Sequence, residues 1–151
     1  MVLTLAGAAC HHQKEPSTTP TPDASHSRGG NGPTGVAPAR NLTRGSWALV
    51  TLHGRPAAPG NRGKPLTVRF APDGTVIGFG GCNGYTGKYA NRADEIRVTA
   101  VVMASEMSCT RGMTAERDFL ATLGKIDGWR VNGGQLELLV SGSPVAVFDP
   151  Q

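Results

Sequence analysis

Twelve residues near the middle of the chain, Gly78 to Tyr89, carry five glycines together with one phenylalanine, two tyrosines and a cysteine. A flexible linker has no use for the aromatic side chains, and a regular strand does not tolerate so many glycines. The combination predicts a tight crossing in a β-sheet, where backbone passes close to backbone and side chains from elsewhere pack over the gaps. The structural motif of this crossing consists of Gly80, Gly81, Asn83, Tyr85 and Gly87.

The composition supports a β-rich fold and excludes some classes of function. The 151 residues include 21 glycines and 11 prolines, which argues against a helical bundle and favours short strands joined by turns. The net charge is +4, but the basic residues are scattered singly, so no basic patch for a nucleic-acid backbone is expected. No apolar run in the folded part approaches the roughly 20 residues that a membrane-spanning helix needs.

Alternating apolar residues predict the strands, and two hairpins are expected to turn at Asp73-Gly74 and at residues 132–134. Between the hairpins, Thr114 is expected to cap a helix from Ala115 to Lys125 with one apolar side. The expected fold class is therefore α+β: a strongly curved antiparallel sheet or open β-barrel covered by one helix. The expected strands cover residues 46–53, 65–71, 76–79, 95–104, 129–131, 135–139 and 145–148.

The N-terminal segments predict anchoring outside the cytoplasm. Residues 1–10 form an apolar run whose last small residues precede Cys10, as before the acylated cysteine of a bacterial lipoprotein signal. The alternative is a disordered terminus with an incidental cysteine. Residues 11–43 are rich in Pro, Gly, Ser and Thr and contain no aromatic residue, which predicts a disordered tether. The folded domain is expected to occupy residues 44–151.

The folded part resembles a known family. The strand that begins with Ser46-Trp47, the Gly-Gly-Cys-Asn segment at 80–83 and the Ser-Glu-Met-Ser-Cys segment at 105–109 are similar to the META domain of HslJ-like proteins. The resemblance continues through the predicted helix to Leu136 and Leu138. It implies an envelope protein, often a lipoprotein, that is linked to stress response and has no established enzymatic activity.

Cys82 and Cys109 are the strongest chemical feature of the folded part. If the domain is exported, two cysteines within one small fold are expected to pair as a disulfide. The alternative is two buried free thiols that behave as small apolar residues. Cys10 is expected to stay out of any bridge, because acylation would use its sulfur.

The remaining reactive side chains predict no catalytic centre, metal site or cofactor. Asn83 either binds a ligand or, as we prefer, holds a turn through bonds to the backbone. A hydrolase using the bend from Ser105 to Thr110 would depend on His53, the single histidine of the folded part. The expected function is a non-catalytic binding or stress-response module, anchored to the membrane by lipid, with an unknown envelope protein or ligand as partner. A purely structural lipoprotein is a further alternative.

Overall fold

A computed structural model describes residues 42–105 and 107–151. The expected signal-like segment, Cys10 and most of the tether therefore lie outside the described residues, as does Glu106. Leu42, two residues before the expected domain start at residue 44, is fully buried, and its carbonyl oxygen accepts a hydrogen bond of 3.1 Å from the indole of Trp47. A single leucine inside a Pro/Gly-rich stretch carries no periodic signal, so composition alone does not reveal this core residue.

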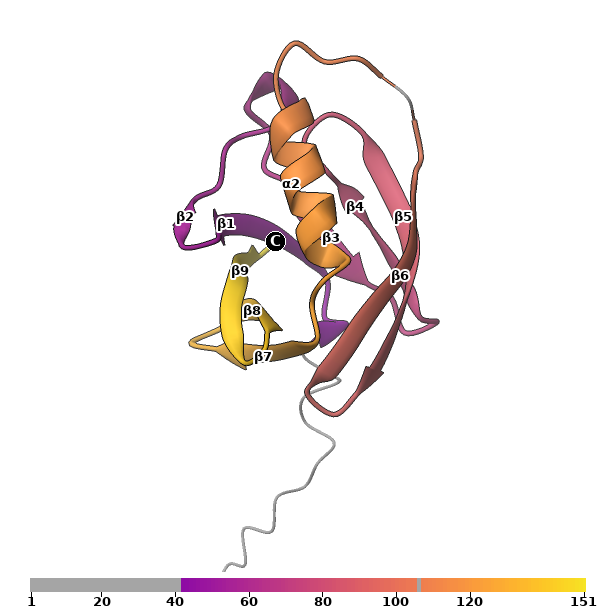
Figure 1. Cartoon of the computed structure of the whole chain (residues 1–151), viewed down its shortest axis with the longest axis vertical. Coiled ribbons are helices and arrows are strands. Elements are labelled where there is room, and N and C mark those ends of the chain that lie inside the picture. Colours follow the sequence, from indigo (N-terminus) through magenta and orange to yellow (C-terminus); the bar gives the residue numbers. More distant parts are fainter. Residues whose placement is uncertain (1–41, 106) are drawn as a thin grey trace, which may run out of the picture. The chain divides into compact units, whose positions relative to one another are not determined.

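The described residues form a large antiparallel sheet that curves into a ring (Figure 1). Its strand order is β2-β1-β3-β4-β5-β6-β7-β8-β9, and a further pairing of β1 with β9 joins the two ends. The pairing of β6 with β7 is limited to Glu95 and Gly128, so the ring is no regular barrel. The strands are β1 Ser46–Leu52, β2 Arg55–Pro56, β3 Thr67–Phe70, β4 Thr75–Phe79, β5 Gly84–Arg92, β6 Glu95–Met103, β7 Gly128–Asn132, β8 Gln135–Val140 and β9 Ser143–Pro150.

The helix α2, Met113–Leu123, lies across the ring and fills it from one side (Figure 1). Phe119 and Leu123 are fully buried, and the ring of Phe119 packs edge-on against Tyr85 of β5 and tilted against Phe148 of β9. The helix thus joins the two halves of the sheet through one aromatic contact to each. A short 3-10 turn, η1 Asn61–Gly63, precedes β3.

The predicted cap of the helix is wrong. The helix begins at Met113, its N-cap is Gly112 with a φ of 98°, and no side chain caps it. Only glycine adopts this φ without strain. The start of the helix is therefore fixed by a backbone contact of Gly112 with another segment, which local sequence signals do not reveal.

Two irregular positions bend the sheet. Between β5 and β6 the register shifts so that Gly87 faces both Ala100 and Val101, and the φ of 50° at Ala100 is rare for a residue with a side chain. Between β1 and β9 the register shifts between Leu49 and Thr51. Bulges of this kind increase the local twist, which a sheet needs in order to return to its first strand.

Gly78 in β4 lies opposite Tyr85 of β5, at the point where the side chain of Tyr85 reaches across β4 to β3. The hydroxyl of Tyr85 donates a hydrogen bond of 2.9 Å to the carbonyl oxygen of Thr67 directly above Gly78. A Cβ at Gly78 would lie 2.7 Å from that hydroxyl and closer still to the carbonyl oxygen of Thr67. The glycine therefore makes room for the bond between the tyrosine and β3.

Replacing Gly78 with alanine is expected to lower the free energy of unfolding by about 3 kcal/mol, because the new methyl group must displace backbone or break the Tyr85 hydrogen bond. Urea unfolding followed by tryptophan fluorescence measures the effect. Gly124→Ala is the matched control, since a Cβ there would meet atoms no closer than 3.8 Å. Equal stability of the two variants would contradict this account of Gly78.

Candidate functional site

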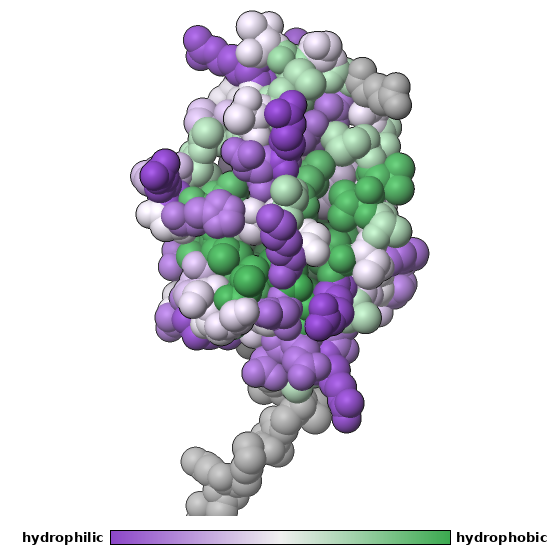
Figure 2. Space-filling model, viewed as in Figure 1, coloured by the Kyte–Doolittle hydropathy of each residue, from purple (hydrophilic) through white to green (hydrophobic). Residues whose placement is uncertain are grey.

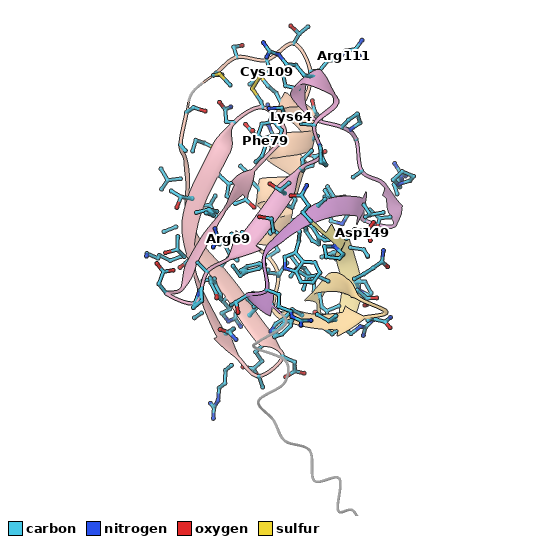
Figure 3. The ribbon with its side chains drawn as sticks, turned by 180° about the vertical axis from the view of Figure 1, so that it is seen from behind. Lys64, Arg69, Phe79, Cys109, Arg111 and Asp149 are labelled. Atoms are coloured by element: carbon cyan, nitrogen blue, oxygen red, sulfur yellow. A yellow bond between two sulfur atoms is a disulfide. The ribbon has the colours of Figure 1, made fainter. Side chains whose placement is uncertain are left out.

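Three chain segments meet backbone to backbone at Gly60, Gly81 and Gly112. The amide of Asn61 donates to the carbonyl oxygen of Gly81 at 2.6 Å. A Cβ at Gly60 would lie 2.5 Å from that oxygen, and a Cβ at Gly81 would lie 2.9 Å from the carbonyl oxygen of Gly112. Figure 3 shows Lys64, Cys109 and Arg111, which flank two of these segments, at one end of the molecule. The glycine-rich stretch is thus a backbone crossing, as its composition predicts.

The carboxylate of Glu116, in the first turn of α2, lies buried beside this crossing. Oε2 accepts hydrogen bonds from the backbone amides of Cys82, at 2.9 Å, and Asn83, at 2.5 Å, while Oε1 accepts one from Nδ2 of Asn83 at 3.0 Å. A Cβ at Gly80 would lie 2.8 Å from Cγ of Glu116. Two consecutive amides that point at one anion satisfy a buried charge without a cation.

The side chain of Asn83 uses all its hydrogen-bonding groups on neighbouring segments. Its Oδ1 accepts from the hydroxyl of Ser105 and the amide of Met107, both at 2.8 Å, and its Nδ2 also donates to the carbonyl oxygen of Met107 at 3.2 Å. We call Gly80–Asn83, Ser105, Met107, Cys109 and Glu116 the Asn83–Glu116 junction. Asn83 is 4% exposed, so the junction leaves it no surface for a ligand.

The structure joins Cys82 and Cys109 in the predicted disulfide, with Cα atoms 5.8 Å apart. The bond attaches the loop between β6 and α2 to the glycine-rich turn, beside the hydrogen bonds of Asn83. With a sequence separation of 27, the chain-entropy treatment assigns the cross-link about 3.5 kcal/mol of stabilisation.

Tyr85 and Tyr89 both point into the ring. The hydroxyl of Tyr89 donates to the carbonyl oxygen of Ala71 at 2.7 Å, and its ring packs edge-on against Phe70. Burial raises the pKa of the Tyr85 hydroxyl far above its ordinary value, and burial followed by the nearby charge of Asp73 raises the pKa of Tyr89. Neither ring is an exposed platform for stacking, and Gly87 between them lies under Val76 and Val101.

Ser105 and His53, the pair on which the alternative hydrolase depends, have different partners. The Ser105 hydroxyl donates to Asn83, near the first turn of α2. Nε2 of His53 lies 3.0 Å from the hydroxyl of Thr122, in the last turn. That hydroxyl gives its one proton to the carbonyl oxygen of Asp118, at 2.7 Å, so Nε2 of His53 is the donor in this pair. The two predicted residues are thus not brought together.

Two adjacent hollows lie on either side of His53 along α2, and we call them together the α2 groove. The first, of about 350 Å³, is lined by residues of β1, β2 and the helix, and the second, of about 390 Å³, by α2, β8 and β9. His53 and Asp118 border both hollows. Figure 2 shows apolar surface beside the charged outer face of the helix. Nothing in the sequence points to this groove, because its walls come from four separate strands and the helix.

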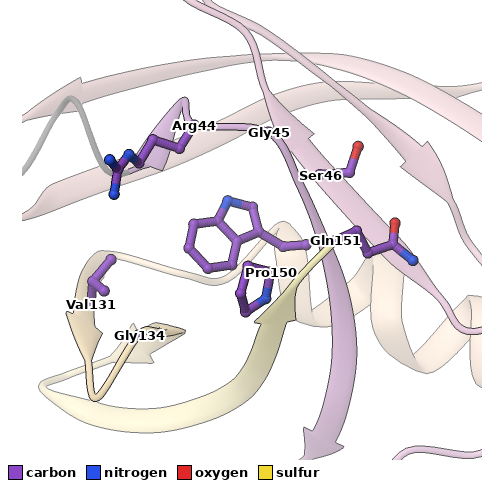
Figure 4. A pocket seen from close by; sticks show the side chains of 8 residues that line it. Arg44, Gly45, Ser46, Val131, Gly134, Pro150 and Gln151 are labelled. Atoms are coloured by element: carbon purple, nitrogen blue, oxygen red, sulfur yellow. The ribbon is translucent and has the colours of Figure 1, made fainter.

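A third hollow, of about 290 Å³, opens at the start of β1 against the ring of Trp47 (Figure 4). Arg44, Val131, Pro150 and Gln151 also line it. Within residues 42–105 and 107–151, no group of three His, Cys, Asp or Glu side chains is placed to hold a metal ion. Over the same part of the chain, no helix has the length and apolar character to cross a membrane.

Sequence reasoning missed the role of Glu116. Its place in the first turn of the helix indicates only a favourable charge for the helix dipole, whereas its partner Asn83 is 33 residues away in sequence. A glutamate near a helix start is ordinary, so only the three-dimensional contact with residues 82 and 83 identifies its role.

Replacing Glu116 with glutamine is expected to lower the free energy of unfolding by about 3 kcal/mol. Glutamine keeps one oxygen for the two backbone amides, but its NH₂ would then face Nδ2 of Asn83, so that buried bond and the negative charge of the acceptor would be lost. The measurement is urea unfolding at pH 7, with the exposed Glu95→Gln in β6 as the same substitution without buried partners. A midpoint unchanged from the wild type would show that the carboxylate does not hold the junction.

Stability is also expected to fall with rising pH above about 10. A tyrosine in an unfolded chain has a pKa of about 10, whereas burial holds the pKa of Tyr85 in the folded protein much higher. The contribution of Tyr85 to stability is therefore complete below the unfolded pKa and is lost as pH rises towards the folded one. The loss amounts to about 1.4 kcal/mol per pH unit for one such group.

Unfolding free energies between about pH 9 and 11 measure this slope, and Tyr85→Phe should flatten it because the variant has no phenolic proton to lose. An equal slope in wild type and variant would refute the assignment to Tyr85.

Comparison with known proteins identifies the family. The family model described as META domain matches residues 40–151. An NMR structure of a protein from Burkholderia xenovorans is 24% identical over 89% of this chain and 99% of its own, with a TM-score of 0.59. A crystal structure of a DUF4847 family protein from Bacteroides vulgatus is 16% identical over 73% of this chain and 94% of its own, with a TM-score of 0.52.

A second NMR structure is 19% identical over 72% of this chain and 92% of its own, also with a TM-score of 0.52. At these identities the solved structures support the fold alone. No curated protein matches the chain. Because the family model spans essentially all of the folded residues, from before Leu42 to Gln151, the chain belongs to the META domain family.

Proposed function

We propose that this protein is a non-catalytic binding module of the bacterial cell envelope, held at a membrane by a lipid on Cys10. The α2 groove is the observation that carries the binding role. It combines an apolar floor with charged side chains at its rim that have no ion partner among the described residues. Surfaces of this composition are typical of small-molecule and partner sites.

The reactive side chains are engaged in structural hydrogen bonds, which favours a binding role over a catalytic one. Inside the junction, the Ser105 hydroxyl donates a hydrogen bond to Asn83, and Asn83 in turn donates one to Glu116. His53 bonds to Thr122 instead. In this proposal the junction is a scaffold, and the function belongs to the surface beside α2.

The placement in the envelope rests on two separate observations. The disulfide between Cys82 and Cys109 is of a kind that persists in oxidising compartments and is rare in the cytosol. Independently, small residues precede Cys10, and the sequence between it and the domain is rich in Pro, Gly, Ser and Thr, as a tether requires. The link to stress response follows from the family resemblance and belongs to the same proposal.

Replacing Cys10 with serine is expected to release the protein from the membrane. The gene is expressed in a bacterial host with its own upstream reading frame, and detergent phase partitioning of the cell fractions measures anchoring. Wild type should enter the detergent phase with a mass increase for acyl chains on Cys10, and Cys10→Ser should remain in the aqueous phase.

His11→Ala is the matched control, since it alters the neighbouring residue and keeps the thiol. Wild-type protein that stays aqueous and unmodified would contradict the lipid anchor.

The same fractions, assayed with ester and glycoside substrates, are expected to show no activity above background. Activity that disappears in His53→Ala would contradict the non-catalytic role.

A further inference from the structure

We propose that the α2 groove binds a small amphipathic carboxylic acid, a medium-chain fatty acid being the simplest case. The apolar chain would lie in the first hollow, against β1 and α2, with the carboxylate on Arg55 of β2. This inference rests on the proposed binding function and adds the class of ligand and its orientation.

The first hollow has the size and the floor that an acyl chain needs. Its volume is about 350 Å³, within the range of about 300–1,000 Å³ that small-molecule pockets occupy. Leu49 and Leu66, both core residues, form part of its wall together with Leu52. The facing side chains, from Ala57, Ala58 and Ala115, are all methyl groups. On that side of the hollow the three alanines leave room that longer side chains would occupy.

The charges around the groove select an anion and orient it. Arg55 and Asp118 are the charged residues of the first hollow and Lys125 is a second cation at the second hollow, so the three charges of the whole groove sum to +1. Arg55 is exposed, and its guanidinium has no hydrogen-bond or ion-pair partner within the described part of the chain. Its planar guanidinium matches the two oxygens of a carboxylate. Asp118 borders the hollow beside His53 and repels a carboxylate there, which favours the Arg55 end.

The second hollow extends the floor for a longer chain. Beyond the bond between His53 and Thr122, it is lined by Ala121, Val140 and Val145. The far end of a longer acyl chain would contact these apolar side chains, and it carries no charge that would need a second binding site. Affinity is therefore expected to rise by about fourfold for each added CH₂ until the chain fills the groove.

The test is an NMR titration of the full chain carrying Cys10→Ser, so that no acyl chain of its own competes. Decanoate is added below its micelle concentration, and amide shifts are mapped. Shifts are expected at Leu52, Ala57 and Ala115, with saturation. Arg55→Gln should weaken binding about tenfold, and decanol, which has the same chain length without the charge, should bind about tenfold more weakly than decanoate.

Arg97→Gln, which removes an exposed cation of β6 away from the groove, is the matched control and should leave the affinity unchanged. Ala58→Trp is a second variant, which fills the hollow from its exposed rim without altering the core, and it should abolish the shifts in a folded protein. Decanoate and decanol binding equally, or Arg55→Gln binding as tightly as wild type, would overturn the assignment of the carboxylate to Arg55. Shifts around Trp47 instead of the α2 groove would overturn the site.

Failure of this inference and failure of the proposed function give different results. If decanoate, decanol and decyltrimethylammonium all fail to bind while Cys10 anchors the protein, the ligand class is wrong and the envelope placement stands. If decanoate binds as described but the wild type is neither acylated nor membrane-bound, the groove assignment stands and the anchoring is wrong.

Discussion

The burial of one carboxylate decides how the parts of this domain are joined. Glu116 has no cation beside it in the described structure, and three N–H groups of residues 82 and 83 supply its hydrogen bonds. Such a charge is tolerated inside a protein only when every donor is present, because the loss of solvation would otherwise exceed the gain. The buried carboxylate is therefore stable only while the first turn of α2 and the glycine-rich turn are in contact. Gly80 allows it, since any side chain there would occupy the place of the glutamate.

The curved sheet explains why the junction is needed. The sheet closes through β1 and β9 by a long pairing, but β6 meets β7 at a single register position. After β6 the chain leaves the sheet and returns as α2, so this part of the domain has little ladder pairing to hold it. Asn83 and the disulfide to Cys109 attach the intervening loop to the glycine-rich turn, and Phe119 attaches the helix to both sheet halves. Side-chain bonds thus replace the missing strand pairing.

The same arrangement separates scaffold from surface. The polar residues that stand out in the sequence, Asn83, Tyr85 and Ser105, are committed to internal hydrogen bonds. The groove beside α2 lies where the helix leaves part of the apolar wall of β1, β8 and β9 uncovered. Its charged rim residues are unremarkable in the sequence, because single arginines and lysines occur throughout a basic chain. The proposed binding function therefore belongs to the α2 groove, a surface that no sequence motif indicates.

Local patterns were sufficient for much of the fold. Alternation located seven of the nine strands, turn residues located both hairpins, and the glycines with aromatics at 78–89 identified a crossing of backbones, because these signals depend on neighbours in the chain. Strands β2 and β5 were not predicted, because a two-residue strand has no period and the glycines of β5 interrupt its alternation. The sequence by itself also determined the two cysteines that could pair and the family to which the chain belongs. Only the tertiary structure decided that Leu42 lies in the core, that Gly112 and not Thr114 is the N-cap of the helix, and that Glu116 holds residues 82 and 83. Each of these depends on a contact between segments far apart in the chain, and the free energy of such a contact comes from burial and satisfied hydrogen bonds that no local window contains.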